Sequence, residues 1–145
     1  MPKRSAHTSW TGGLQDGSGR VTLTSSGVGE YDVSFPKRTA DEAGGTTSPE
    51  ELIAAAHASC YAMQLSAMVA RAEATPKVLE VDATVSLDPD PAGGFRISSI
   101  ALVVRGDVEG LDDARFKEVA DQAKAQCPVS KALTGTSITL DAALV

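Results

Sequence analysis

The chain has 145 residues, 42% of them hydrophobic and 22% charged, which is ordinary for one folded domain over residues 1–145 and unlike a disordered chain. A formal net charge of -6, with 13 scattered Lys and Arg residues, argues against nucleic acid as a partner. The start of the chain lacks the apolar run of a signal peptide, and the longest apolar segment is broken by polar residues. We therefore expect a cytoplasmic protein that does not enter the membrane.

The first part of the chain is predicted to form a small sheet and a loop. Alternating or β-branched runs indicate an antiparallel meander of three strands, at residues 6–10, 20–26 and 31–35. The following segment, PKRTADEAGGTTSPE, combines charges with the adjacent Gly44 and Gly45 and has no apolar period. It is predicted to be a mobile loop.

A long helix is expected next. Ser48 and Pro49 are typical of an N-cap followed by proline at the first helical position, and Glu50 and Glu51 suit the positive end of the helix dipole. The apolar sequence that follows predicts a helix to about Ala72.

The remainder alternates strands and helices. Two strand patterns separated by the turn sequence DPDPAGG predict a hairpin, and an amphipathic pattern then predicts a helix that Cys127 ends. A short helix begins with Pro128, and the chain closes with a strand. These elements are expected at residues 77–87, 95–106, 111–126, 127–133 and 137–145.

The predicted fold class is α+β, with antiparallel sheets packed on a central buried helix. Because a small chain cannot easily cover a helix that is apolar on all sides, a second subunit should complete the cover. We expect an intertwined homodimer in which the helices that carry Cys60 pack together.

The two cysteines, Cys60 and Cys127, are expected to be free thiols, metal ligands or a redox pair, since a reducing compartment disfavours a permanent disulfide. Taken alone, Cys60 is typical of apolar packing, and burial would raise its pKa. Cys127 sits where helical N–H groups point at its sulfur, which favours a low pKa, although a plain N-cap has the same pattern. His57 with the cysteines is weak evidence for a metal, because no second CxxC or HxxxH motif exists.

The motifs SPEELIAAAHASC, followed by Tyr61, and CPVSKAL, about 67 positions later, together with an arginine in the preceding loop, carry a family resemblance. The chain resembles the OsmC branch of the OsmC/Ohr family of thiol peroxidases over nearly its whole length. Both cysteine motifs at this separation are far more specific than either alone. The resemblance implies an OsmC-like fold and a role in oxidative or osmotic stress defence.

The resemblance also implies roles for four residues. Cys60 matches the peroxidatic cysteine, which a hydroperoxide oxidises to a sulfenic acid, and Cys127 matches the resolving cysteine, which closes an intramolecular disulfide. Arg38 matches the arginine that stabilises the thiolate, and Glu50 matches the acidic residue that holds the arginine. Glu51 is hard to separate from Glu50 by sequence.

The sequence after Arg38 departs from the family pattern, so Lys37 is the alternative cation, although lysine lacks the planar fork of donors. Cys60 and Glu50 are ten residues apart, about 15 Å along a helix, so they cannot meet within one straight helix. Either the first turn is not helical, or Arg38 and Glu50 reach Cys60 of the other subunit. We expect the second arrangement.

Because sulfur is the redox centre in such enzymes, no metal, haem or flavin cofactor is expected, and the reductant implied by the resemblance is a dithiol such as a lipoyl group. Tyr61, Met63 and Ile53 suggest an apolar approach that favours organic hydroperoxides over hydrogen peroxide. The alternative is a non-enzymatic stress protein or small-ligand-binding protein on the same fold.

Overall fold

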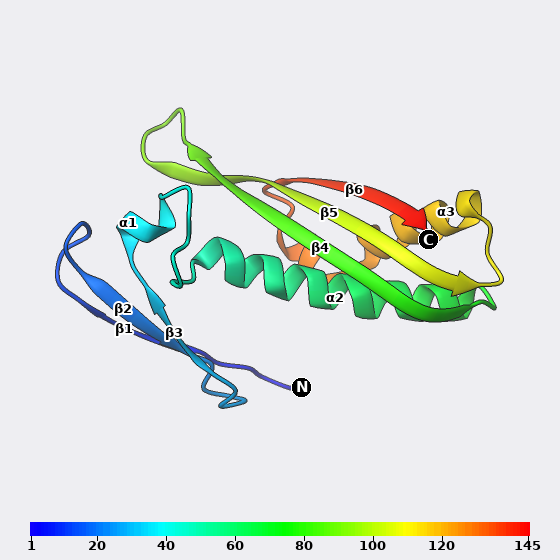
Figure 1. Ribbon diagram of the computed structural model, residues 1–145, viewed down its shortest axis with the longest axis horizontal. Helices are drawn as coiled ribbons and strands as arrows, with labels where there is room; N and C mark the ends of the chain where they lie inside the picture. The colour runs from blue at the N-terminus through cyan, green and yellow to red at the C-terminus, as the bar shows by residue number, and fades with distance from the viewer. The chain divides into compact units, whose positions relative to one another are not determined.

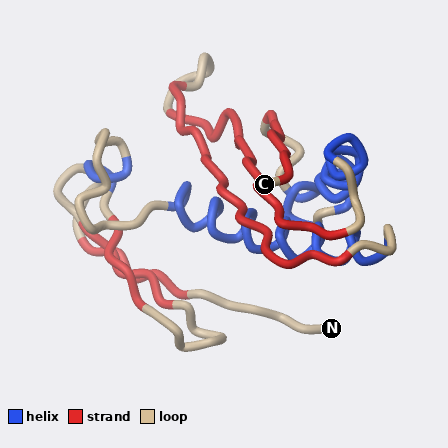
Figure 2. Tube along the Cα trace, turned by 45° about the vertical axis from the view of Figure 1, so that its right-hand side comes forward, coloured by secondary structure: helices blue, strands red, loops and turns tan.

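The structure is a computed structural model that describes all residues from 1 to 145. The chain divides into two compact units, Met1–Leu52 and Ile53–Val145. Strands occur in both units, and Figure 2 distinguishes them from the helices and loops. That residues 1–145 form one domain stays a prediction.

The first unit contains the predicted three-stranded meander. The strands β1 (His7–Thr11), β2 (Ser18–Thr22) and β3 (Glu30–Val33) pair antiparallel in the order β1-β2-β3. The second strand ends four residues before its predicted end, because the Gly27 N–H donates to the Leu23 carbonyl and closes a turn. Gly27 has a φ of 68°, a conformation that glycine adopts without strain.

The segment after β3 begins with a short helix and not with the predicted loop. Helix α1 spans Phe35–Arg38, and the Ser34 hydroxyl accepts a hydrogen bond from the Lys37 N–H as its N-cap. Pro36 stands in the first turn, where its missing N–H has no helical partner to lose. Arg38 therefore belongs to the last turn of a helix, which corrects the prediction that it lies in a loop.

Helix α2 spans Pro49–Arg71, in agreement with its predicted limits. The Ser48 hydroxyl accepts a hydrogen bond from the Glu51 N–H, so the predicted N-cap is confirmed. In this single chain the helix is buried along one face only; the buried residues are Glu50, His57, Tyr61, Leu65, Met68 and Val69. Helix α2 is long and apolar enough to cross a membrane, but the core helix of a soluble protein can have the same length and composition. The expectation that the chain does not enter the membrane therefore stays a prediction.

The second unit contains a mixed sheet, where an antiparallel one was predicted. Strands β4 (Thr75–Pro89) and β5 (Phe95–Glu109) form the expected hairpin, but β6 (Ser137–Leu144) runs parallel to β5, as Figure 1 shows. The connection from β5 to β6 passes through helices α3 (Asp113–Gln126) and α4 (Pro128–Ala132). A crossover of this length lets the chain return in the same direction, which a short turn cannot do.

The core of this second unit lies between the buried face of α2, the sheet and α3. Gly106 of β5 is needed there, since a Cβ atom would come 2.8 Å from the Phe116 ring of α3. Cys127, between α3 and α4, is completely buried in the same core. The core thus encloses one of the two predicted redox cysteines.

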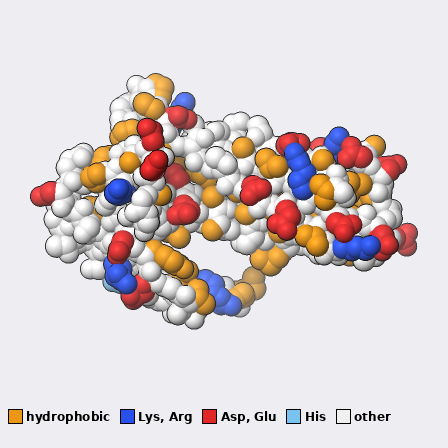
Figure 3. All heavy atoms as spheres, viewed as in Figure 1, with side chains coloured by type: hydrophobic (Ala, Val, Ile, Leu, Met, Phe, Trp, Pro, Cys, Tyr) orange, Lys and Arg blue, Asp and Glu red, His pale blue; other side chains and the backbone are white.

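The charged side chains do not gather by sign on the face in Figure 3, where Lys and Arg are interspersed with Asp and Glu. Several are paired, for example Arg105 with Asp141 at 2.8 Å and Lys117 with Asp113 at 2.7 Å. Within each unit, the side visible in this view has no continuous basic stripe of the kind that tracks a phosphate backbone. The expectation that nucleic acid is not a partner stays a prediction.

Candidate active site

The two cysteines are brought together although 67 residues separate them. Their Sγ atoms are 3.4 Å apart, with Cys60 partly buried on α2 and Cys127 buried between α3 and α4. Both are free thiols, and a disulfide needs a separation of about 2.0 Å. Once one of the two sulfurs has been oxidised, a small approach would therefore be enough for a disulfide to form.

Local sequence explains the position of Cys127. It is both the C-cap of α3, with its N–H donating to the Ala123 carbonyl, and the N-cap of α4. Pro128 cannot continue the hydrogen bonding of α3, but it suits the first position of α4. Cys127 makes no side-chain capping hydrogen bond at the start of α4, but the N–H groups of Val129 and Ser130 lie on the side of its sulfur and lower its pKa.

The surroundings of the two cysteines within this unit shift their pKa values in opposite directions. Burial raises the pKa of Cys127, but the nearby Ser130 N–H, the Cys60 thiol, the Ser130 hydroxyl and the Val129 N–H together outweigh burial and lower it. Burial raises the pKa of Cys60, the neighbouring Cys127 raises it further, and the Val129 N–H opposes this only in part. The immediate surroundings thus favour the thiolate on Cys127.

Ser130 is a residue that the sequence analysis did not identify. Its Oγ lies 2.7 Å from Nε2 of His57, which is completely buried on α2. Burial lowers the pKa of His57, so the ring is neutral. The chain has no group of three or more His, Cys, Asp or Glu side chains arranged to hold a metal ion. The only sequence signal for Ser130 was its place in the CPVS motif, and its partner His57 is 73 residues away in the chain.

Arg38 and Glu50 form the second pair. The Arg38 Nη2 donates to Glu50 Oε1 at 2.7 Å, and Nε lies 3.1 Å from both carboxylate oxygens. Burial raises the pKa of Glu50, but the hydrogen bonds and charge of Arg38, with the Glu50 N–H and the Ser48 hydroxyl, lower it overall. Because the overall pKa is lowered, Glu50 remains an anion at neutral pH although its side chain is only 10% exposed, and it holds the guanidinium in one orientation.

The structure separates the alternatives that the sequence left open for this pair. Glu51 accepts a hydrogen bond from the Thr47 hydroxyl and not from Arg38. Lys37 points to Gly44, where a Cβ atom would come 2.8 Å from its Nζ atom. The contact of Arg38 is therefore with Glu50, and the four predicted residues form two pairs, one in each compact unit.

Arg38 also lines an apolar cavity within the Met1–Leu52 unit. The cavity has a volume of about 360 Å³. Its walls include Trp10 and Leu14 from the start of the chain, and Phe35 from α1. A guanidinium beside apolar walls is suited to a small molecule with one polar and one apolar end.

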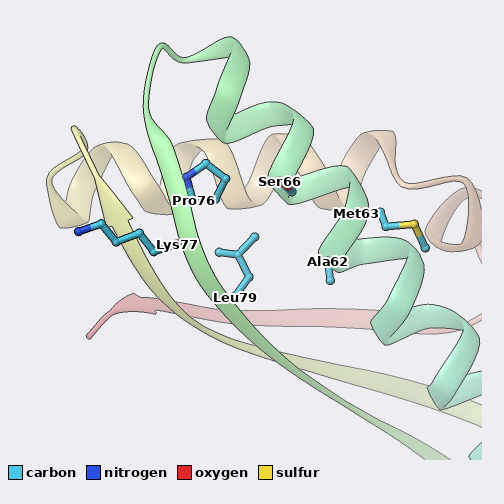
Figure 4. A pocket seen from close by; sticks show the side chains of 6 residues that line it. All are labelled: Ala62, Met63, Ser66, Pro76, Lys77 and Leu79. Carbon is cyan, nitrogen blue, oxygen red and sulfur yellow. The ribbon is translucent and has the colours of Figure 1, made fainter.

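A second cavity of about 410 Å³ lies in the other unit, between α2 and β4. Figure 4 shows Met63 and Ser66 of α2 on one side of this cavity and Leu79 of β4 on the other. Tyr61 lines neither cavity, because it is completely buried and its hydroxyl donates to the Ala120 carbonyl. The suggestion that Tyr61 contributes to an apolar approach is therefore wrong, whereas Met63 is 69% exposed.

A sequence model of the family described as OsmC-like protein matches residues 41–142, a range that includes both cysteines and Glu50. The chain belongs to the OsmC-like protein family. The resemblance seen in the two cysteine motifs is thereby confirmed. Arg38 lies just before the matched range, so its position rests on the contact with Glu50.

Two relatives place the chain within this OsmC-like family. It is 42% identical to "Peroxiredoxin OsmC" of Escherichia coli, over 96% of this chain and 93% of that protein. It is 35% identical to "Organic hydroperoxide resistance protein OhrA" of Bacillus subtilis, over 99% of this chain and 98% of that protein. Both relatives match nearly end to end.

A solved structure shows the same OsmC-like fold. The crystal structure of the organic hydroperoxide resistance protein OhrB of Bacillus subtilis has a TM-score of 0.74 and 29% identity to this chain. The match covers 95% of this chain and 97% of that one. The mixed α and β content with two sheets is therefore that of the family.

Proposed function

We propose that this chain is a thiol-dependent peroxidase that reduces organic hydroperoxides, and hydrogen peroxide more slowly, in defence against oxidative or osmotic stress. The relatives named as a peroxiredoxin and an organic hydroperoxide resistance protein support the peroxidase class. The observation that carries the proposal is the 3.4 Å contact between the sulfurs of Cys60 and Cys127. Protein sulfur passes the electrons directly to the hydroperoxide, and no metal, haem or flavin cofactor is required.

In the first step the Cys60 thiolate attacks the terminal oxygen of the hydroperoxide. A sulfur–oxygen bond forms, the oxygen–oxygen bond breaks, and the alkoxide leaves and takes a proton to become an alcohol. Arg38 stabilises both the thiolate and the alkoxide that develops. Its charge would also reverse the local preference for a thiolate on Cys127, since a nearby guanidinium lowers a thiol pKa.

In the second step Cys127 attacks the sulfur of the Cys60 sulfenic acid. The Cys60–Cys127 disulfide forms, and hydroxide leaves and is protonated to water. The contact distance of the two sulfurs supports this step. An external dithiol, such as a lipoyl group, then reduces the disulfide by thiol–disulfide exchange and is itself oxidised to a cyclic disulfide.

The two residue pairs would meet in an intertwined homodimer in which Arg38 and Glu50 of one subunit serve Cys60 of the other. Glu50 and Cys60 are ten residues apart on α2, about 15 Å along the axis. Because α2 begins at Pro49, its first turn is helical, which removes the alternative of an irregular start. The exposed face of α2 supports the dimer; it includes Ala55, Ala56, Ser59, Met63, Ala67 and Ala70.

Titration of free thiols before and after one equivalent of cumene hydroperoxide tests the peroxidase proposal. We expect the loss of two thiols per chain, because the sulfenic acid of Cys60 is resolved by Cys127. The Cys127→Ser variant, which has one thiol to begin with, is the matched control and should lose one. Unchanged thiols in the wild-type chain would instead favour a non-enzymatic stress protein or small-ligand-binding protein.

The preference for organic hydroperoxides follows from the apolar cavity beside Arg38. An alkyl or aryl group that leaves water for this cavity gains binding energy that hydrogen peroxide cannot obtain. We expect the second-order rate constant to be roughly tenfold or more higher for cumene hydroperoxide. Stopped-flow measurement of Cys60 oxidation gives both constants, and equal values would refute the preference.

A further inference from the structure

His57 is a buried titratable residue that the proposed peroxide chemistry leaves without a role. Its side chain is completely buried, and its Nε2 atom lies 2.7 Å from the Ser130 hydroxyl oxygen. Its other ring nitrogen, Nδ1, has no hydrogen-bond partner. A polar ring in an apolar core costs free energy unless its polar atoms are engaged, so the single contact with Ser130 needs a physical reason.

Ser130 connects this histidine to the resolving cysteine. The serine hydroxyl has only one hydrogen, and both Nε2 of His57 and the sulfur of Cys127 lie within its reach. If Nε2 carries the ring proton, it donates to Ser130 Oγ and the hydroxyl hydrogen is free to point at the sulfur. If Nδ1 carries the proton, Nε2 must accept that same hydrogen, and the sulfur loses a donor.

The balance of hydrogen bonds favours the first arrangement when Cys127 is a thiolate. With the proton on Nε2, only the lone pair of His57 Nδ1 is left without a partner. With the proton on Nδ1, a buried N–H group and one lone pair of the thiolate are both unsatisfied. Buried N–H donors without acceptors are rare and costly, so the tautomer and the thiolate stabilise one another.

We propose that His57 is a positioning residue for Cys127, which acts through Ser130 by directing the serine hydroxyl hydrogen to the sulfur and so holding Cys127 as the attacking thiolate. The proposal rests on the proposed function of Cys127 as the resolving cysteine. In that step the electron pair of the Cys127 thiolate forms the sulfur–sulfur bond. The Cys60 sulfur–oxygen bond breaks, and the hydroxide that leaves is protonated to water by an acid of the solvent buffer.

The other groups that face Cys127 do not substitute for this connection. Tyr61 of α2 uses its hydroxyl hydrogen on the Ala120 carbonyl, and burial, together with the charges of Asp121 and Cys127, raises its pKa. Cys60 is the sulfur to be attacked. The N–H groups of Val129 and Ser130 are fixed by α4 and do not depend on His57.

The pKa of Cys127 can be measured directly in a Cys60→Ser background, where the thiolate absorbance near 240 nm reports one sulfur. We expect His57→Phe to raise this pKa by about one unit, so that at a given pH the thiolate is about tenfold scarcer. His57→Gln keeps an N–H donor and should restore most of the loss. Ser59→Ala is the matched control, because its hydroxyl bonds only to backbone carbonyls of α2.

A double-mutant cycle tests whether His57 and Ser130 act on the pKa of Cys127 through one connection or independently. Ser130→Ala should raise the pKa of Cys127 at least as much as His57→Phe, and the double variant should add little to Ser130→Ala alone. In chains with both cysteines, disulfide formation after rapid oxidation should slow by about tenfold in each variant. Trapping of the sulfenic acid with dimedone measures its longer lifetime.

The proposal is overturned if the pKa of Cys127 is the same with His57, glutamine or phenylalanine at position 57. Should His57→Phe fail to fold, an unchanged pKa of Cys127 in Ser130→Ala would overturn it equally well. Failure of the peroxidase proposal is distinguishable, because then cumene hydroperoxide would consume no thiols while the pKa of Cys127 still responded to position 57.

Discussion

Replacing Cys60 by serine is expected to reduce the rate of hydroperoxide reduction by about 10³-fold or more, because the hydroxyl of serine is a far weaker nucleophile than a thiolate at neutral pH. Cys127→Ser should differ in kind. Its Cys60 is still oxidised once, but the sulfenic acid then persists or is oxidised further to sulfinic acid. The measurement is multiple-turnover alcohol production beside a single-turnover count of oxidised thiols by mass spectrometry.

The contrast between the two cysteine variants decides their roles. The local electrostatics lower the pKa of Cys127 and raise that of Cys60, so the structure of the Ile53–Val145 unit alone would make Cys127 the better nucleophile. If Cys127→Ser lost the first oxidation step while Cys60→Ser kept it, the assigned roles would have to be exchanged. If the first oxidation step were lost to the same extent in both variants, the reaction would need the two cysteines as a unit.

Replacing Arg38 by alanine is expected to raise the pKa of Cys60 by ~1–3 units, because the guanidinium is proposed to face the thiolate in the assembled site. At neutral pH the oxidation rate should fall by roughly the same factor as the thiolate fraction, which is about tenfold to 10³-fold. The pH dependence of Cys60 oxidation in a Cys127→Ser background gives both quantities. Lys37→Ala is the matched control, since the Lys37 side chain lies at Gly44 and the ion pair with Glu50 is made by Arg38.

Glu50→Gln should act in the same direction as Arg38→Ala but more weakly. The amide keeps a hydrogen-bond acceptor for Arg38 but loses the charge that holds the guanidinium at 2.7 Å. Glu51→Gln leaves this contact intact, because Glu51 bonds to Thr47. An equal effect of the two glutamine variants would show that the Arg38–Glu50 pair does not orient the arginine.

Mixing of subunits tests whether the site is shared. Heterodimers of Arg38→Ala with Cys60→Ser should regain about one wild-type site, since one interface then combines an intact Arg38 with an intact Cys60. Each homodimer of the same variants lacks one of the two groups at every site. No recovery of activity in the mixed sample would mean that each chain builds its own site.

Features that depend on a few neighbouring residues could be predicted from sequence. The start of α2 at Pro49 and the break between α3 and α4 at Cys127 follow from caps and prolines that act within one turn. Helix α1 also forms by local chemistry, because Ser34 caps it and Pro36 stands in its first turn. The glycines and charges that follow had instead led to the prediction of a loop. The cysteine motifs were equally local, and they carried the family.

Contacts between distant segments were decided only by the tertiary structure. The sequence assigned the arginine contact to Glu50 but could hardly separate it from Glu51. The direction of each side chain at the start of α2 pairs Glu50 with Arg38 and Glu51 with Thr47. The parallel pairing of β6 with β5 depends on how α3 and α4 pack, not on the strand residues. His57 and Ser130 meet across 73 residues because burial of the α2 face brings α4 against it, a choice made by the core as a whole.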